Sequence, residues 1–386
     1  SFQGSFTLKN GTFVAAVSPA GTSGSFGGGK DPTVGDASPT SSGTATLLLA
    51  KDVSTDRLFK VPATAGSQAV VIGIAEPGGT ATFNNQIRTS RDITLIAGGS
   101  STAIFSSPWM SFDNTTMTRN VTVGGTGYTG TVRILNALAT EGLVTVPFGA
   151  LDLGLTGTIA AGGPLSIGSS GALTGIGRVT GGVGGAGLVA PGNSAGIATV
   201  GGIDPSGGLD FNFEFTGTGS PDYAATAASI NDVLRITGST PFMSSLSATN
   251  GNVVNVYFAV GALVGGEVLR GGFYTDGAGD FLSSIQNATF NYWVAGSGSH
   301  IYNSGTYVPL ATYNPALLVD VTTTPQTTGT FADGTQLGGQ VSTFTVAVVV
   351  PEPGTLALAA LGIGLAGLAA ARRPRRSFRT ASRSRP

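Results

Sequence analysis

Cysteine is absent from the 386 residues, which excludes disulfide bonds, thiolate metal ligands and a cysteine nucleophile. Charged residues reach only 10%, whereas there are 62 glycines. Glycine at this level without a strict three-residue period excludes collagen, and a hydrophobic fraction of 41% is too high for a disordered chain. The composition therefore predicts a folded β protein rich in tight turns.

Charge is distributed unevenly along the chain, although the formal net charge is only −1. Seven arginines and no acid follow Ala371, so the chain without them carries a net charge of −8. An acidic body does not offer the clustered Lys and Arg that bind phosphate, so nucleic acid is excluded as a partner.

Only one long uncharged apolar run occurs, from Thr355 to Ala371. As a helix, these seventeen residues would span about 25 Å, near the lower limit for crossing a hydrocarbon core of about 30 Å. The arginines that follow it would stay on the cytoplasmic side and leave the body outside the inner membrane. These membrane-stop residues are Arg372, Arg373, Arg375 and Arg376.

A rigid segment, Pro351-Glu352-Pro353, comes directly before the apolar run. Its two prolines prevent both helix continuation and ladder hydrogen bonding, so the peptide must be extended and accessible to a processing enzyme. An ordinary uncleaved anchor and a buried apolar helix are the alternatives. The chain opens at Ser1 without a basic and apolar leader, so we expect that a signal peptide was trimmed or lies outside this sequence.

The order Pro-Glu-Pro, short apolar helix and arginine cluster resembles the PEP-CTERM sorting signal. This resemblance implies an exosortase-type processing enzyme as a partner, a transient inner-membrane anchor, and cleavage that passes the body to the cell surface or extracellular matrix. We assign residues 351–376 to this signal and residues 377–386 to a basic cytoplasmic tail.

Short apolar runs separated by glycine fill the middle of the chain, with 23 glycines in residues 121–202. Strands of four to six residues between tight turns are typical of a β-solenoid or a many-stranded sandwich. No fixed period is evident. Residues 190–196, Ala-Pro-Gly-Asn-Ser-Ala-Gly, resemble a glycine-rich segment of autotransporter-type passenger β-helices, which implies a corner between coils at Gly192 and Asn193.

Longer, more aromatic strands are expected after residue 207. Residues 209–215, Leu-Asp-Phe-Asn-Phe-Glu-Phe, alternate strictly, which predicts one packed face and one wet face. We therefore predict an all-β fold: a solenoid-like region at 1–206, a second β unit at 207–350 that is a sandwich or a cap, and one C-terminal transmembrane helix.

Candidate chemistry is sparse. His300 lies in a stretch typical of a surface turn, and nothing around it indicates a serine triad. Asp276 and Asp280 weakly resemble a calcium turn, although turn aspartates satisfied by their own backbone are the simpler interpretation. The other acids are scattered singly, so we predict no catalytic residues, no cofactor and no enzyme.

Two functions remain. The first is an exported structural or adhesive protein that contacts exopolysaccharide or further copies of itself. The alternative is a secreted protein that binds or degrades polysaccharide on a β-helix scaffold.

Overall fold

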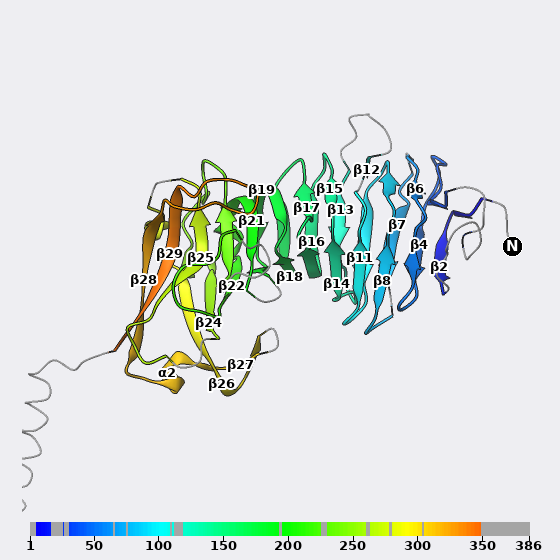
Figure 1. The fold of residues 1–386 in the computed structure, drawn as a ribbon. Helices are drawn as coiled ribbons and strands as arrows, with labels where there is room; N and C mark the ends of the chain where they lie inside the picture. Colours follow the sequence, from blue (N-terminus) through cyan, green and yellow to red (C-terminus); the bar gives the residue numbers. More distant parts are fainter. Residues whose placement is uncertain are drawn as a thin grey trace, which may run out of the picture.

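The computed structural model shows an elongated β body in which the strands follow one another along a single axis (Figure 1). It describes residues 5–16, 26, 31–64, 66–74, 76–108, 110–111, 119–192, 195–224, 230–259, 263–277, 280–302 and 305–348. The prediction of an all-β body with long parallel pairings is confirmed.

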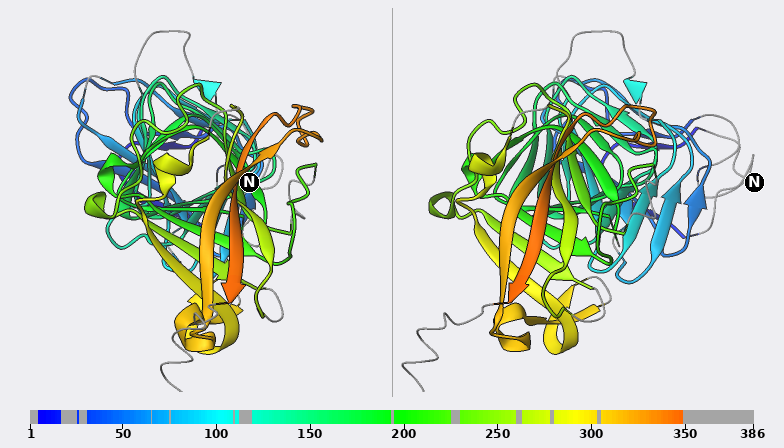
Figure 2. Two further views of the ribbon diagram at one scale, coloured as in Figure 1. Left: turned by 90° about the vertical axis from the view of Figure 1, so that its left-hand side faces the viewer. Right: turned by 60° about the vertical axis from the view of Figure 1, so that its left-hand side comes forward.

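Each turn of the chain contributes strands to three parallel ladders, so successive coils stack on one another (Figure 2). The first ladder contains β2 (Gly11–Ala15), β4 (Thr44–Leu49), β7 (Ala69–Ile74), β10 (Ile93–Ala97), β13 (Val121–Val123) and the first halves of β16 (Val144–Leu153) and β18 (Leu165–Gly175). It continues through the second halves of β19 (Arg178–Gly185) and β21 (Ile197–Asp204).

The second ladder runs from β5 to β26. It contains β5 (Ser54–Thr55), β8 (Thr80–Phe83), β11 (Thr102–Phe105), β14 (Thr131–Ile134), the second halves of β16 and β18, β20 (Leu188–Pro191), β22 (Asp210–Phe215), β24 (Val253–Phe258) and β26 (Thr289–Tyr302).

The third ladder has two parts. The first is a separate sheet of β1 (Thr7–Leu8), β3 (Thr33–Val34), β6 (Phe59–Val61), β9 (Ile87–Thr89) and β12 (Met110–Ser111). The second contains β15 (Ala137–Ala139), β17 (Thr158–Ala160), the first halves of β19 and β21, β23 (Val233–Ile236) and β25 (Val268–Thr275).

Coil length varies, which explains why the sequence shows no fixed period. Thr80 pairs with Thr102, and Thr102 pairs with Thr131, so two adjacent coils differ in length by seven residues. Farther along the chain the length varies even more, since Ala172 pairs with Leu188 whereas Phe211 pairs with Val254. Extra residues lie at the corners between strands, where they leave the parallel register intact.

The core lies inside the coils, where side chains of the same column stack along the axis. Leu47, Ile72, Leu95 and Val123 follow one another in register and are fully buried. Phe83 stacks on Phe105 with ring centroids 4.7 Å apart. Such dry columns supply most of the stability of a fold whose short strands would be marginal alone.

Antiparallel strands end the body. β29 (Gly339–Val348) pairs with β25 on one side and with β28 (Leu317–Gln326) on the other, and β27 (Gly305–Pro309) folds back on β26. Short helical turns α1 (Leu282–Ile285), α2 (Leu310–Tyr313), η1 (Pro205–Gly207) and η2 (Ala248–Asn250) connect the elements. The parallel pairing continues across residue 207, and whether the chain divides there into two independently folding units stays a prediction.

The alternation predicted for residues 209–215 is half right. Leu209, Phe211, Phe213 and Phe215 are fully buried inside the coil, as expected. The opposite face was predicted to be wet, which is wrong, because Asn212 and Glu214 are also buried. The returning strand β27 covers this face, and the Tyr307 hydroxyl donates to Glu214 Oε1 at 2.9 Å.

Candidate functional site

The predicted sorting residues lie beyond the described part of the chain. β29 ends at Val348, and Pro351, Glu352, Pro353 and the arginines at 372, 373, 375 and 376 all follow it. Within the described ranges, which stop at 348, no helix is long and apolar enough to cross a bilayer. The predicted span at 355–371 falls outside those ranges.

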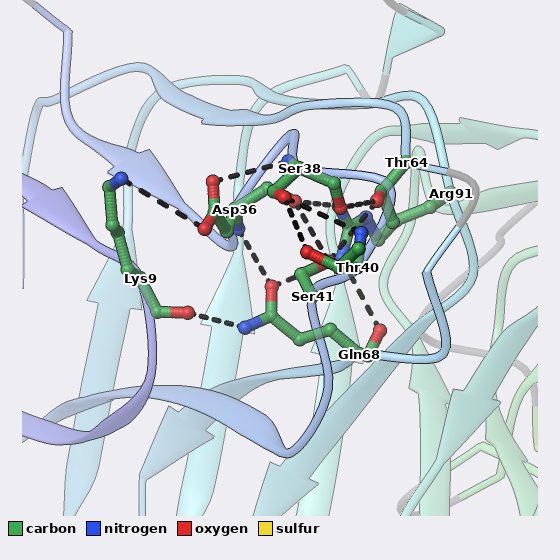
Figure 3. A network of polar contacts seen from close by, with 8 residues as sticks. All are labelled: Lys9, Asp36, Ser38, Thr40, Ser41, Thr64, Gln68 and Arg91. Carbon is green, nitrogen blue, oxygen red and sulfur yellow. Dashed lines mark hydrogen bonds and ion pairs between the residues drawn. The ribbon is translucent and has the colours of Figure 1, made fainter.

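A buried arginine organises the corner that follows the third ladder (Figure 3). Arg91 Nη2 donates to Asp36 O at 2.7 Å, Nε donates to Pro62 O at 2.8 Å, and Nη1 donates to Gln68 Oε1 at 3.2 Å and Gln68 O at 3.3 Å. Burial lowers the pKa of Arg91, and the nearby Asp36 charge opposes this shift. The guanidinium remains charged and satisfies carbonyls of two preceding coils at once.

Gln68 extends the same network to the first coil. Its Oε1 also accepts from Asp36 N–H at 2.7 Å, and its Nε2 donates to Lys9 O. Thr64 Oγ1 donates to Ser38 O at 2.6 Å, which adds a further contact between the corners. Four successive coils are therefore joined by side chains whose positions are fixed by backbone partners (Figure 3).

A polar hollow of about 460 Å³ opens beside this network. Its polar lining consists of hydroxyl, amide, carboxylate and guanidinium groups: Thr64, Ser67, Gln68, Ser90, Arg91, Asp92, Thr94, Asn120 and Thr122. Asp92 accepts from Asn120 N–H at 2.7 Å, so its carboxylate is held at the rim of the hollow. Such a surface can hydrogen-bond a neutral, hydroxyl-rich ligand.

A row of hydroxyls leads away from the hollow along the outer face of the first ladder. Thr94, Thr122, Thr145 and Ser166 are neighbours in register, one in each successive coil. Adjacent strands lie about 4.8 Å apart, so the backbone positions that carry these hydroxyls repeat at about that spacing. Thr145 Oγ1 donates to Thr122 Oγ1 at 3.4 Å.

The calcium candidates do not come together. Asp276 accepts two bonds from Arg235, each at 2.9 Å, and Arg235 also pairs with Asp333 and lies 3.8 Å from the Phe331 ring centroid. Asp280 accepts instead from Thr323 Oγ1 at 2.6 Å, which lowers the pKa of its carboxyl. Within the described ranges no group of three or more His, Cys, Asp or Glu is placed to hold a metal.

His300 does not lie in a surface turn, because it belongs to β26 and is half-buried. Its ring stacks on Trp293 with centroids 3.9 Å apart, and its Nε2 lies 3.0 Å from the Tyr257 hydroxyl. Tyr302 stacks on the other side of this group, 4.0 Å from Tyr257. The histidine is thus part of an aromatic cluster that covers the outer face of β24.

Asp232 is the most deeply buried acid of the described chain. Its Oδ1 accepts from Gly196 N–H at 2.8 Å and its Oδ2 from Glu214 N–H at 2.7 Å. Burial raises its pKa well above the ordinary value, and the two N–H donors oppose this only in part. The carboxyl is fully enclosed, so it satisfies backbone groups and does not face a ligand.

The sequence-based interpretation missed both Arg91 and Asp232. Arg91 reaches Gln68 and Asp36 across 23 and 55 positions of sequence, and no local pattern links them. The one available signal was positional, since both Pro62 and Arg91 follow short strands of the same ladder.

Residues 349–376 match the PEP-CTERM protein-sorting motif. The match includes Pro351, Glu352 and Pro353 and ends at Arg376, so the predicted sorting signal is confirmed. It indicates an exported protein that exosortase processes at the membrane. The likeness of residues 190–196 to autotransporter passengers stays a prediction, since that match does not extend to them. Neither a curated protein nor a solved structure matches the chain significantly.

Proposed function

We propose that this protein is a non-enzymatic, adhesive component of the cell surface or extracellular matrix that binds exopolysaccharide through the polar hollow. The observation that carries the proposal is the meeting of this 460 Å³ hollow with the hydroxyl row at Thr94 and Thr122. A polysaccharide presents hydroxyls at regular intervals along its length, and a straight row of donors and acceptors can follow such a chain over several sugar units.

Preorganisation supports binding at this place. Gln68 and Arg91 are fixed by several backbone partners each, so a ligand in the hollow does not have to order them. The row itself stands on strands whose inner residues are fully buried, such as Leu95 and Val123. A rigid, hydroxyl-lined surface suits adhesion, because it lowers the entropic cost of each contact.

Several carboxylates outside the hollow are bound by structural partners, which supports a non-catalytic role. Glycoside hydrolysis needs two carboxyl groups that face each other across a substrate. In the described residues, Asp152 is bound to Arg133 at 2.6 Å, Asp276 is bound to Arg235, and Asp232 is enclosed by backbone donors. These carboxylates are committed to structural partners.

The test uses mature protein purified from its native host and exopolysaccharide from the same host. We expect the double variant Thr94→Val/Thr122→Val to bind about tenfold more weakly in co-sedimentation, because it loses two hydroxyls while keeping shape and strand propensity. Thr46→Val is the matched control, since Thr46 belongs to the first ladder but does not line the hollow.

Equal binding by all three proteins would refute the hollow as the binding site. Release of new reducing ends during incubation would instead favour the alternative, a polysaccharide-degrading protein.

A further inference from the structure

We propose that the C-terminal end of the β body is a docking surface for the membrane-embedded processing enzyme. The surface, here called the exit collar, consists of Val264, Leu318 and Val348. These aliphatic side chains are 70%, 60% and 49% exposed, and Val348 is the last described residue before the sorting motif. The inference rests on the sorting match and not on the proposed glycan binding.

Chain length places the enzyme against this end of the body. Only two residues separate Val348 from Pro351, so the Cα atoms of these two residues lie at most about 11 Å apart. A specific protein interface covers roughly 800 Å² on each partner, which is far wider than this gap. An enzyme that grips residues 351–353 must therefore also meet the residues around the end of β29.

The collar is built rigidly, which an incidental exposed side chain would not require. Val264 N–H and Gly265 N–H donate to the Glu267 carboxylate at 2.8 and 2.9 Å, and Gly266 N–H donates to Val346 O at 2.7 Å. Gly265 has a φ of +99°, which favours glycine, and a Cβ there would crowd Val348 Cγ2. The turn thus presents Val264 directly beside the end of β29.

The apolar side chains surround the chain exit on both sides of the terminal hairpin. Val348 pairs with Leu317, whereas the next residue, Leu318, pairs with Ala347. Successive residues of a strand point to opposite faces, so Leu318 and Val348 lie on different sides. An enclosing partner fits this arrangement better than a flat lipid surface, and the neighbouring acids Glu267 and Asp320 do not favour an anionic bilayer.

The experiment follows tail removal from the full chain in its native host, by pulse labelling and intact-mass analysis. We expect Val264→Asp and Leu318→Asp each to slow processing about tenfold, because each places a charge in an apolar contact. Val264→Ile should keep the normal rate. Val14→Asp is the matched control, since Val14 is 47% exposed on β2, at the opposite end of the body.

A variant with a spacer distinguishes slow processing caused by lost docking from slow processing caused by misfolding. Ten Gly/Ser residues inserted after Val348 uncouple the body from the enzyme, so Val264→Asp should then have no further effect on the rate. Processing of Val264→Asp at the rate of Val14→Asp would overturn the proposal, as would a slow rate that persists with the spacer. Loss of vesicle flotation by the mature Val264→Asp protein, where the unaltered protein floats, would assign the collar to lipid and overturn the enzyme as its partner.

Discussion

The two ends of the body satisfy backbone groups in opposite ways. In the N-terminal coils a buried cation, Arg91, donates hydrogen bonds to the backbone carbonyls of Asp36, Pro62 and Gln68. In the C-terminal coils a buried acid, Asp232, accepts hydrogen bonds from the N–H groups of Gly196 and Glu214. Both side chains lie at corners, where extra residues interrupt the ladders and leave polar groups that the parallel register cannot pair.

This difference contrasts an arginine whose charge does not change with pH and a carboxyl whose charge does. An arginine stays protonated throughout the physiological pH range, so the hydrogen bonds that Arg91 donates persist across that range. The carboxyl of Asp232 has a raised pKa, so its charge and its cost of burial change with pH. The type of ionisable group at a corner therefore decides whether that corner responds to acidity.

The largest effect is expected at the cationic corner. Arg91→Met should lower the free energy of unfolding by about 3 kcal/mol, because it leaves several buried acceptors without donors. Arg91→Lys should recover only part of this loss, since an ammonium cannot reproduce the planar fork. Chemical denaturation measures both, and hydrogen exchange would show protection lost first around residues 60–62.

Arg88→Met provides the control for that experiment, because Arg88 is only half-buried and its Nε binds Gln86 at 3.3 Å. It should change stability by less than about 0.5 kcal/mol. If Arg91→Met is equally mild, the network does not hold the coils together.

The acidic corner should give a pH-dependent effect. Above the unfolded pKa of Asp232, near 3.8, the unfolded chain loses a proton that the folded chain retains, so stability falls as pH rises towards the raised folded pKa. The slope for one group is at most about 1.4 kcal/mol per pH unit. Asp232→Asn should flatten this decline in denaturation curves measured between pH 4 and neutrality.

The pKa of Asp280 is shifted in the opposite direction to that of Asp232. Its lowered pKa stabilises the fold above the unfolded value, and this contribution is lost as pH falls through the folded value. Asp280→Asn should therefore lower stability by a constant amount above the unfolded pKa and flatten the pH dependence only in the acid limb of the curve. A decline between pH 4 and neutrality that persists in Asp232→Asn would locate the sensitivity elsewhere.

The smallest effect is expected on the outer face of the C-terminal coils. Asn255 donates to Asn212 Oδ1 at 2.9 Å and accepts from Asn291 Nδ2 at 3.0 Å, which forms a three-residue asparagine ladder. Asn255→Leu should cost about 1 kcal/mol in thermal or chemical denaturation. The exposed Asn250→Ala is the control, and equal effects of the two would show that the ladder adds no stability.

Local chemistry made much of the fold predictable. Short apolar runs between glycines correspond to strands such as β14 and β18, and Gly192 has a φ of +77° at the corner that was predicted from Pro191 and its neighbours. The buried column of Phe211, Phe213 and Phe215 followed from strict alternation. Each of these signals lies within about ten residues of sequence.

The burial of side chains by residues distant in sequence was not predictable in the same way. Glu214 is buried against Tyr307, which is 93 positions away in sequence, and Asn212 accepts from Asn255, 43 positions away. The environment of His300 likewise depends on stacking with Tyr257, in another coil. The sorting motif, in contrast, occupies one continuous stretch of sequence, residues 349–376, so its residues could be identified directly. Nonlocal contacts determine which polar groups become enclosed, and periodicity does not contain that information.

The position of β29 between β25 and β28 also has a mechanical consequence. A pull on the chain that follows β29 would reach the body through Val348. Hydrogen bonds on both flanks of β29 then share the load in shear, and none is opened one at a time. The strand that leads to the sorting motif is thus suited to withstand traction.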